Sequence, residues 1–251
     1  MRKYILLIVF VSVAVCAYAE DSMEKNGFGA RMRQSNFHLG IDFQTKYVWR
    51  GMEMIPSNSA PVLFPQVNYQ YGGLCTYAMG GYSLNGNYAE VDLGVNYTWN
   101  CLTMGINDYF YPALDTLQDK YFNFNRYTSG HWLEAFATFA PEKIPAYLTV
   151  SNFFYGADKT PDGKQAYSTY VELGGYYDFL ESNRLSLVIG AACNSSCYTG
   201  YETGFGVCNL EFKYTYTVLF EHDWFIPLNV SYIINPVREK SFINFSTSFV
   251  F

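Results

Sequence analysis

Apolar and polar residues alternate along the segment from residue 36 to residue 50. Its odd positions from Phe37 to Trp49 are apolar except for Thr45. Its even positions are polar or glycine except for Val48. A period of two directs alternate side chains to opposite faces of a β-strand. Strands of soluble domains usually span about five or six residues, whereas a tilted strand that crosses a bilayer needs about ten. The segment therefore predicts a membrane-length strand.

Segments of the same kind recur along the rest of the chain. They cover residues 62–71, 74–84, 89–99, 102–111, 132–140, 147–155, 167–177, 184–192, 204–216, 226–234 and 241–251. With the first segment the total is about twelve, an even number, as in single-chain bacterial barrels. The pattern predicts an all-β fold, a transmembrane antiparallel up-and-down β-barrel of about twelve strands over residues 36–251.

The connections between these segments alternate in length. The short ones are residues 72–73, the junction at Asn100, and residues 141–145 and 178–183. The long ones are residues 51–60, 112–131, 156–166 and 193–203. Barrels of the outer membrane have tight periplasmic turns and longer external loops. Two connections fit less well, because 85–88 is short for an external loop and 217–224 is long for a periplasmic turn.

Aromatic residues collect toward the ends of the predicted strands. At the periplasmic ends they are Tyr69, Tyr71, Tyr97, Trp99, Tyr214, Tyr216, Phe249 and Phe251. Tyr47 and Trp49 lie toward the outer end of the first strand. Because amphipathic rings favour membrane–water interfaces, we expect two aromatic rims. The alternative is a secreted β-sandwich, which hides its apolar faces between two sheets and normally has shorter strands.

The N-terminal residues have the features of a secretory signal. Arg2 and Lys3 precede an apolar run over residues 5–16, and Ala-Tyr-Ala at residues 17–19 fits a cleavage site. Cys16 raises the alternative of a lipoprotein, although Val15 is bulkier than lipidation sites normally allow. The predicted domains are a cleaved signal peptide (1–19), a periplasmic segment (20–35) and an outer-membrane barrel (36–251).

The last predicted strand, over residues 241–251, ends on Phe251. Pairing of this strand with the first one closes a barrel without a free edge. We expect the strand that ends on Phe251 to be recognised by the barrel-assembly machinery.

Composition supports a surface that does not face water. Half of the residues are apolar, 20% are aromatic and only 15% are charged, whereas soluble domains have about a quarter charged residues. After residue 19 no run of about 18 apolar residues is present, and closed barrels are the other structure that spans lipid. Outer-membrane lipid is the expected partner. The net charge of −6 argues against nucleic acid.

The cysteine spacing matches no zinc pattern, and we expect neither a metal nor a cofactor. Cys193 and Cys197 lie in one predicted connection. They either form a disulfide in an oxidising compartment or serve as small apolar residues.

Several motifs resemble a family of uncharacterised bacterial outer-membrane proteins, the putative porins of the TorF type, especially those of Bacteroidetes. The motifs are Tyr-Val-Trp-Arg-Gly at 47–51, Ile-Asn-Asp-Tyr-Phe-Tyr-Pro at 106–112, Ser-Asn-Phe-Phe-Tyr-Gly-Ala-Asp at 151–158, Ala-Tyr-Ser-Thr-Tyr-Val-Glu at 166–172 and Asn-Pro at 235–236. The family usually has small residues where Thr45 and Lys46 stand. The resemblance implies an outer-membrane barrel and brings no substrate and no catalytic residues.

If the apolar set faces lipid, the alternate set faces the barrel interior. The charged residues of that set are Asp42, Lys46, Arg50, Glu90, Asp92, Glu134, Glu172, Glu211 and Lys213. Six of these nine charges are acidic, so a water-filled interior favours cations. The alternative is a packed interior in which the basic residues pair with carboxylates. Arg50 and Gly51 form a strand-end anchor or, alternatively, a ligand contact.

The connection 112–131 contains four aromatic residues among polar ones: Tyr121, Phe122, Phe124 and Tyr127. It either folds over the barrel mouth as a lid or binds a glycan or another partner.

The sequence offers few catalytic candidates. Its histidines are His38, His131 and His222, and no Gly-x-Ser-x-Gly motif is present. His38 and Asp42 share one strand face but lie roughly 13 Å apart. We therefore predict a protein that is not an enzyme, a porin-like barrel with a narrow cation-preferring passage for small solutes. A closed barrel that acts as a structural or ligand-binding surface protein through its loops is the alternative, and a lipid-acting hydrolase is a third hypothesis.

Overall fold

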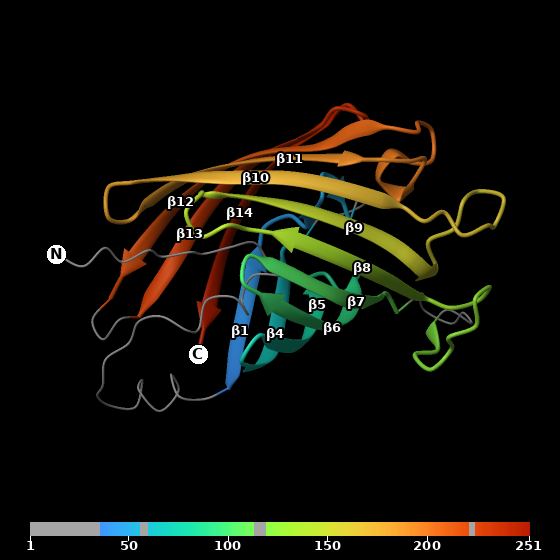
Figure 1. Ribbon diagram of the computed structural model, residues 1–251, viewed down its shortest axis with the longest axis horizontal. Coiled ribbons are helices and arrows are strands. Elements are labelled where there is room, and N and C mark those ends of the chain that lie inside the picture. The colour runs from blue at the N-terminus through green and yellow to red at the C-terminus, as the bar shows by residue number, and fades with distance from the viewer. Residues whose placement is uncertain (1–35, 56–59, 113–118, 221–223) are drawn as a thin grey trace.

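The computed structural model of the protein describes residues 36–55, 60–112, 119–220 and 224–251. Twelve strands form one closed antiparallel barrel (Figure 1). They are β1 (Phe37–Gln44), β4 (Val62–Tyr71), β5 (Leu74–Ser83), β6 (Ala89–Trp99), β7 (Leu102–Phe110), β8 (His131–Phe139), β9 (Ala146–Gly156), β10 (Thr169–Phe179), β11 (Asn183–Ala192), β12 (Gly206–Leu219), β13 (Phe225–Asn235) and β14 (Lys240–Val250). The predicted twelve-stranded barrel is confirmed, and the sandwich alternative is wrong. The predicted segments 1–19 and 20–35 lie outside the described residues.

Strand order follows the sequence around the barrel, and β1 pairs with β14 to close it. This seam is short, because it joins residues 40–44 of β1 to residues 246–250 of β14, whereas β1 pairs with β4 over its full length. The expected pairing of the last strand with the first is present. The closed sheet therefore leaves no long strand edge open.

The two ends of the barrel carry different connections. The turns between β4 and β5, β6 and β7, β8 and β9, and β10 and β11 are short and lie at the same end as the C-terminus, at the left in Figure 1. The connections between β7 and β8, β9 and β10, and β11 and β12 are longer and lie at the opposite end. We call these the short-turn end and the long-loop end.

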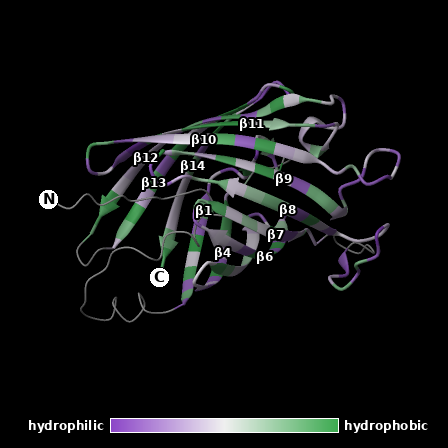
Figure 2. Ribbon diagram, viewed as in Figure 1, coloured by the Kyte–Doolittle hydropathy of each residue, from purple (hydrophilic) through white to green (hydrophobic). Residues whose placement is uncertain are grey.

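The distribution of side chains is inverted relative to that of a soluble barrel. Outward positions such as Ile41, Leu93 and Ile106 are 37%, 41% and 47% exposed, whereas inward Asp42 is 4% exposed. Figure 2 shows the corresponding alternation of hydrophobic and hydrophilic bands along the strands. Among the described residues, no helix combines the length and the apolar character that crossing a membrane requires. Apolar side chains thus form the outer wall, and the interior holds most of the polar strand side chains together with aromatic ones such as Tyr109 and Phe153.

The first strand ends earlier than predicted, because β1 stops at Gln44 and the chain then turns into the barrel. Residues 45–55, which we call the inner hairpin, contain the short strands β2 (Val48–Trp49) and β3 (Met52–Glu53). The turn inward is fixed by Asn244 of β14, whose Oδ1 accepts from Oγ1 of Thr45 at 3.1 Å and from the backbone N of Lys46 at 3.0 Å.

Tyr47 and Trp49 therefore do not belong to an outer rim. Tyr47 contacts the ring of Phe64 at 4.8 Å, and Trp49 contacts that of Tyr109 at 5.7 Å, both inside the barrel. Large rings bury more apolar surface in a packed interior than at a strand end. The alternation of apolar and polar residues does not show that the chain leaves the wall here. At the short-turn end the expected rings do face outward, among them Tyr71 and Trp99, which are 69% and 66% exposed.

Substitution of Leu93 by arginine tests whether the outer wall faces lipid. Leu93 faces outward near the middle of β6, so Leu93→Arg is expected to destabilise the barrel in lipid by about 2–4 kcal/mol. Urea unfolding in lipid vesicles measures this difference. Tyr127→Arg is the control, since Tyr127 is 72% exposed on a connection and its replacement changes stability little. Equal stability of Leu93→Arg and wild type would contradict a lipid-facing wall.

Candidate functional site

The inner hairpin is built on a two-residue turn. Arg50 has φ 49° and Gly51 has φ 76°, and Trp49 pairs with Met52 on either side of them. Positive φ at both central residues is the signature of a type I′ turn. A Cβ atom on Gly51 would lie 1.9 Å from the carbonyl oxygen of Cys208, so only glycine fits. Residues other than glycine rarely adopt positive φ, because it is sterically unfavourable for them. The positive φ of Arg50 must therefore be stabilised by other interactions, and we infer that these are the contacts of its side chain.

The Arg50 side chain joins the inner hairpin to the wall. Its Nη1 donates to Oε1 of Glu134 at 2.5 Å, and its Nη2 donates to Oε2 at 3.2 Å. Nη1 also donates to the hydroxyl oxygen of Tyr198 at 2.6 Å. The guanidinium lies 4.4 Å from the ring centroid of Trp49 and 4.7 Å from that of Tyr170. A bidentate ion pair and two cation–π contacts therefore anchor the hairpin.

Glu134 on β8 is held from its other side by side chains of neighbouring strands. The Tyr109 hydroxyl donates to its Oε2 at 2.9 Å, and Nδ2 of Asn107 donates to the same atom at 3.4 Å. Asn107 in turn accepts from the hydroxyl of Tyr77 at 2.9 Å. The Glu134 side chain has no exposed surface. A buried ion pair needs such partners for its remaining polar atoms, and β5 and β7 supply them.

Aromatic side chains pack around the Arg50–Glu134 pair. This interior aromatic cluster consists of Trp49, Tyr109, Trp132, Phe153, Tyr170 and Tyr198. Tyr198 belongs to the short 3-10 helix η3 (Cys197–Thr199) between β11 and β12, so a second connection also folds into the barrel. Nδ2 of Asn235 donates to the carbonyl oxygen of Gly51 at 3.1 Å. The two inserted segments together fill the interior toward the long-loop end.

The five motifs singled out in the sequence contribute residues to this site. The motif at 47–51 forms the turn of the inner hairpin, and Asn235 of the 235–236 motif bonds to it. The other three motifs contribute Tyr109, Phe153 and Tyr170 to the cluster. Segments far apart in the sequence thus build one site.

Asp42 and Lys46 lie inside the barrel near the start of the inner hairpin. Oδ2 of Asp42 accepts from Nε2 of Gln66 at 3.2 Å. Nζ of Lys46 pairs with Oε1 of Glu53 at 2.6 Å. Glu53 was not a sequence candidate, because its interior position follows from the turn at Arg50–Gly51 and not from the phase of a wall strand.

The predicted charges on β10 and β12 also point inward. Glu172 accepts from the hydroxyl groups of Tyr147 and Tyr170 at 2.7 and 2.6 Å. Oε1 of Glu211 accepts from the hydroxyl of Ser231 at 2.8 Å, and Nζ of Lys213 lies 3.3 Å from the same oxygen. Glu90 and Asp92 on β6 complete the set and are 2% and 1% exposed. All nine predicted positions therefore face the interior, and most of their charges are engaged there.

Sequence reasoning missed Tyr198 and Asn235 as parts of this site. Both lie at or beyond the long-loop end of the wall. Alternation predicts the direction of a side chain only within a regular strand, so it gives no direction there. The only signal for Asn235 was its place in a resembling motif.

Tyr121 and Phe124, in the connection between β7 and β8, pack against His131 on the outer face of the wall. Asn107 and Tyr109 face inward, so the alternate residues Asp108 and Phe110 face outward, and His131 lies opposite Phe110. The described residues of this connection thus lie on the outer wall and do not form a lid over the barrel mouth.

His131 fastens that connection to the wall. Its Nδ1 lies 2.9 Å from each carboxylate oxygen of Asp108, and its Nε2 lies 2.5 Å from the carbonyl oxygen of Tyr121. The ring of Phe124 stacks on His131 with a centroid distance of 4.2 Å. Both ring nitrogens of His131 contact these oxygen atoms. The contacts therefore connect the loop to the wall and leave no ring nitrogen free to act as a general base.

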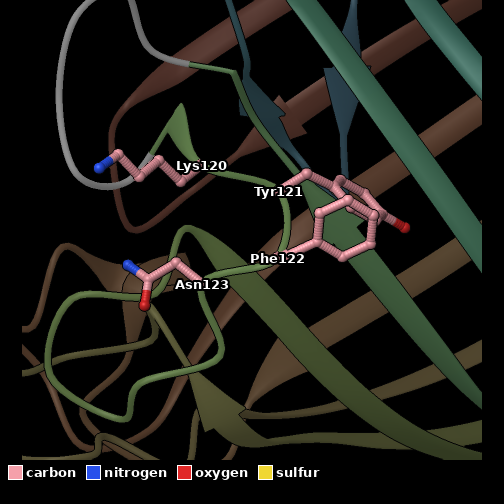
Figure 3. Close-up of a pocket in the computed structure, with 4 residues that line it drawn as sticks. All are labelled: Lys120, Tyr121, Phe122 and Asn123. Atoms are coloured by element: carbon pink, nitrogen blue, oxygen red, sulfur yellow. The ribbon is translucent and has the colours of Figure 1, made fainter.

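The other predicted loop aromatics stay accessible. Phe122 and Tyr127 are 89% and 72% exposed. An open hollow of about 610 Å³ is lined by Lys120, Tyr121, Phe122 and Asn123. In Figure 3 the rings of Tyr121 and Phe122 extend to one side of the chain, whereas Lys120 and Asn123 extend to the other.

Cysteine reactivity tests whether the connection between β11 and β12 folds inward. Cys193 and Cys197 are free thiols; Cys193 is exposed, whereas burial raises the pKa of Cys197 to about 12. Because the thiolate is the reactive form, we expect iodoacetamide at pH 8 to modify Cys193 and to spare Cys197 and buried Cys208. Peptide mass spectrometry before and after denaturation measures this. Equal labelling of Cys193 and Cys197 in the folded protein would place the connection outside the barrel.

Comparisons with known proteins return only solved structures of low similarity. No protein-family model matches the chain, and no curated protein matches it. A structure from a study of the in-meso crystallization of membrane proteins has 9% identity and a TM-score of 0.49, with 86% of this chain and 83% of that chain covered. The KdgM porin has 4% identity and a TM-score of 0.47, with 85% and 98% covered. A Rhodopseudomonas blastica porin triple mutant has 10% identity and a TM-score of 0.40, with 76% and 55% covered. Similarity at these levels carries no functional conclusion.

Proposed function

We propose that the protein is a porin-like barrel of the bacterial outer membrane with a narrow, cation-preferring passage for small solutes, constricted by the inner hairpin. The observation that carries this proposal is the inverted side-chain distribution, with an apolar exposed wall around a polar interior. Closed barrels of this kind satisfy every backbone group within lipid. The resemblance to TorF-type proteins and recognition of β14 by the barrel-assembly machinery belong to the same proposal.

The cation preference follows from the interior charges. Carboxylates outnumber basic groups among the nine predicted residues, and Glu53 adds one more acid. A narrow space with low-dielectric walls strengthens the field of such groups and attracts cations. Neutral small solutes are limited by the space that the inner hairpin leaves.

Planar-bilayer recording in a KCl gradient tests the passage. We expect a small conductance whose reversal potential has the sign for K⁺ over Cl⁻. Removing two interior carboxylates in Glu172→Gln/Glu211→Gln is expected to lower this preference, because the interior becomes less negative. Glu142→Gln, in an exposed turn, is the control and leaves the reversal potential unchanged. Anion preference of the wild type would exclude the proposal.

A second candidate function is a ligand-binding surface protein that acts through its connections. The favouring observation is the exposure of Phe122 and Tyr127 beside the hollow at residues 120–123, because such rings can stack on sugars. This function predicts that Phe122→Ala/Tyr127→Ala abolishes binding to immobilised oligosaccharides while the conductance is retained. Absence of binding by the wild type would remove the candidate.

A further inference from the structure

Two carboxylates of β6 differ from the other acids of the interior. Glu90 and Asp92 occupy alternate positions of the strand, face inward and are 2% and 1% exposed. Oε2 of Glu90 accepts from the hydroxyl groups of Tyr88 and Tyr47 at 2.6 and 3.5 Å. Oε1 of Glu90 and Oδ1 of Asp92 are buried and have no hydrogen-bond partner.

The basic groups of the interior pair with other acids. These ion pairs are Arg50–Glu134, Lys46–Glu53, Lys213–Glu211 and Arg184–Asp178. Within the part of the chain that the structure describes, no lysine or arginine forms an ion pair with Glu90 or Asp92. The negative charge of this pair is therefore not balanced by a side chain described there.

Two ionised carboxylates at this place need either a positive charge or protons to neutralise them. Removing a carboxylate from water without a counter-charge costs several kcal/mol, and two positions on one strand face are only about 7 Å apart. Like charges at this separation repel each other, more strongly in a protein interior than in water. The backbone of Gly81 leaves no side chain between Glu90 and β5, and a Cβ atom there would lie 2.7 Å from Oε1 of Glu90.

We propose that Glu90 and Asp92 together bind one divalent cation, Ca²⁺ or Mg²⁺, inside the barrel. Two carboxylates match the double charge, and oxygen atoms of carboxylates, hydroxyls and water are the ligands that these cations prefer. No cluster of three or more histidine, cysteine, aspartate or glutamate side chains suited to a metal occurs in the described residues. Water molecules therefore complete the coordination shell, as they commonly do around Mg²⁺.

The site adjoins the inner hairpin through Tyr47, whose hydroxyl reaches Glu90. If the proposal holds, divalent cations are the ions that the interior binds most tightly. The proposal rests on the proposed function only in that ions must reach the interior. Binding and passage are separate measurements. Ca²⁺ binding without bilayer current would support the site and remove the passage, and selective current without Ca²⁺ binding would do the reverse.

Isothermal titration of the detergent-solubilised full protein with CaCl₂ tests the site. We expect one saturable site in the wild type and binding weakened roughly tenfold or more in Glu90→Gln and in Asp92→Asn, because each loses one charged ligand. Glu211→Gln is the matched interior control, since Glu211 pairs with Lys213, and it is expected to bind Ca²⁺ like the wild type. A parallel titration with MgCl₂ shows which of the two divalent ions the site binds more tightly.

Folding of each variant is checked by its compact migration in unheated gels. If a variant does not fold, the unfolding temperature of the wild type decides: Ca²⁺ is expected to raise it, and K⁺ at equal ionic strength is not. Absence of saturable Ca²⁺ binding by the folded wild type, or undiminished binding by Asp92→Asn, would overturn the proposal and leave the carboxyl groups holding protons.

Discussion

Replacing Arg50 with alanine is expected to destabilise the folded barrel by about 3–5 kcal/mol, because Glu134 then remains as a buried charge without its partner. The same change removes the contacts that stabilise the positive φ of residue 50. Chemical denaturation in detergent, followed by tryptophan fluorescence, measures the loss; Trp49 itself reports on the interior. Release of the inner hairpin is expected to accompany it.

Two further variants separate the ion pair from general packing. Arg50→Ala/Glu134→Gln is expected to recover part of the lost stability, because the unpaired buried charge is gone. Arg184→Ala is the matched control: Arg184 also forms two hydrogen bonds to its partner, but that partner, Asp178, is 46% exposed. Water can solvate the carboxylate that this substitution leaves, so we expect a smaller loss than for Arg50→Ala. A loss for Arg50→Ala no larger than for Arg184→Ala would show that the buried pair does not anchor the hairpin.

Removal of the inner hairpin is expected to produce the largest change in conductance. A chain in which a Gly-Ser linker replaces residues 47–53 loses Tyr47, Trp49 and the Arg50 anchor, which together occupy the interior toward the long-loop end. An emptied barrel of about twelve strands has room for a water-filled passage. We therefore expect a several-fold higher single-channel conductance, with cation preference retained because the wall carboxylates remain.

The control shortens the exposed turn at residues 160–164, which lies in the connection between β9 and β10. Among the described residues its hydrogen bonds are local, such as those between Thr160 and Lys164. This change leaves the conductance at the wild-type level. Unchanged conductance after removal of the inner hairpin would show that the hairpin does not limit the passage.

The wall was predictable from the sequence because alternation carries the information directly. Residues such as Asp92 and Leu93 differ in polarity, and the pleat alone sends them to opposite faces. Apart from the end of the first strand, strand ends were found within a few residues for the same reason. The signal is strong because one face of most strands carries almost no charged residues, as expected for the lipid-facing wall that we propose.

The site was less predictable because its central elements leave the wall. Alternation continues beyond Gln44 without a break, so the sequence shows a longer strand where the structure turns inward at Thr45. The Arg50–Gly51 dipeptide did indicate a turn. The partners of Arg50, by contrast, come from distant strands and from η3, and no local pattern connects them. The motifs included Tyr109, Tyr170 and Asn235, alternation placed Glu134 on the inner face, and nothing in the sequence marked Tyr198 or showed that these positions meet.

The short seam between β1 and β14 gives the inner hairpin a mechanical role. The hairpin follows directly after β1, and Thr45, Lys46 and Gly51 are bonded to residues of β13 and β14 on the far side of the seam. Separating β1 from β14 would therefore strain the hydrogen bonds that hold the inner hairpin inside the barrel. Separation of the two strands and displacement of the inner hairpin are therefore expected to be mechanically coupled.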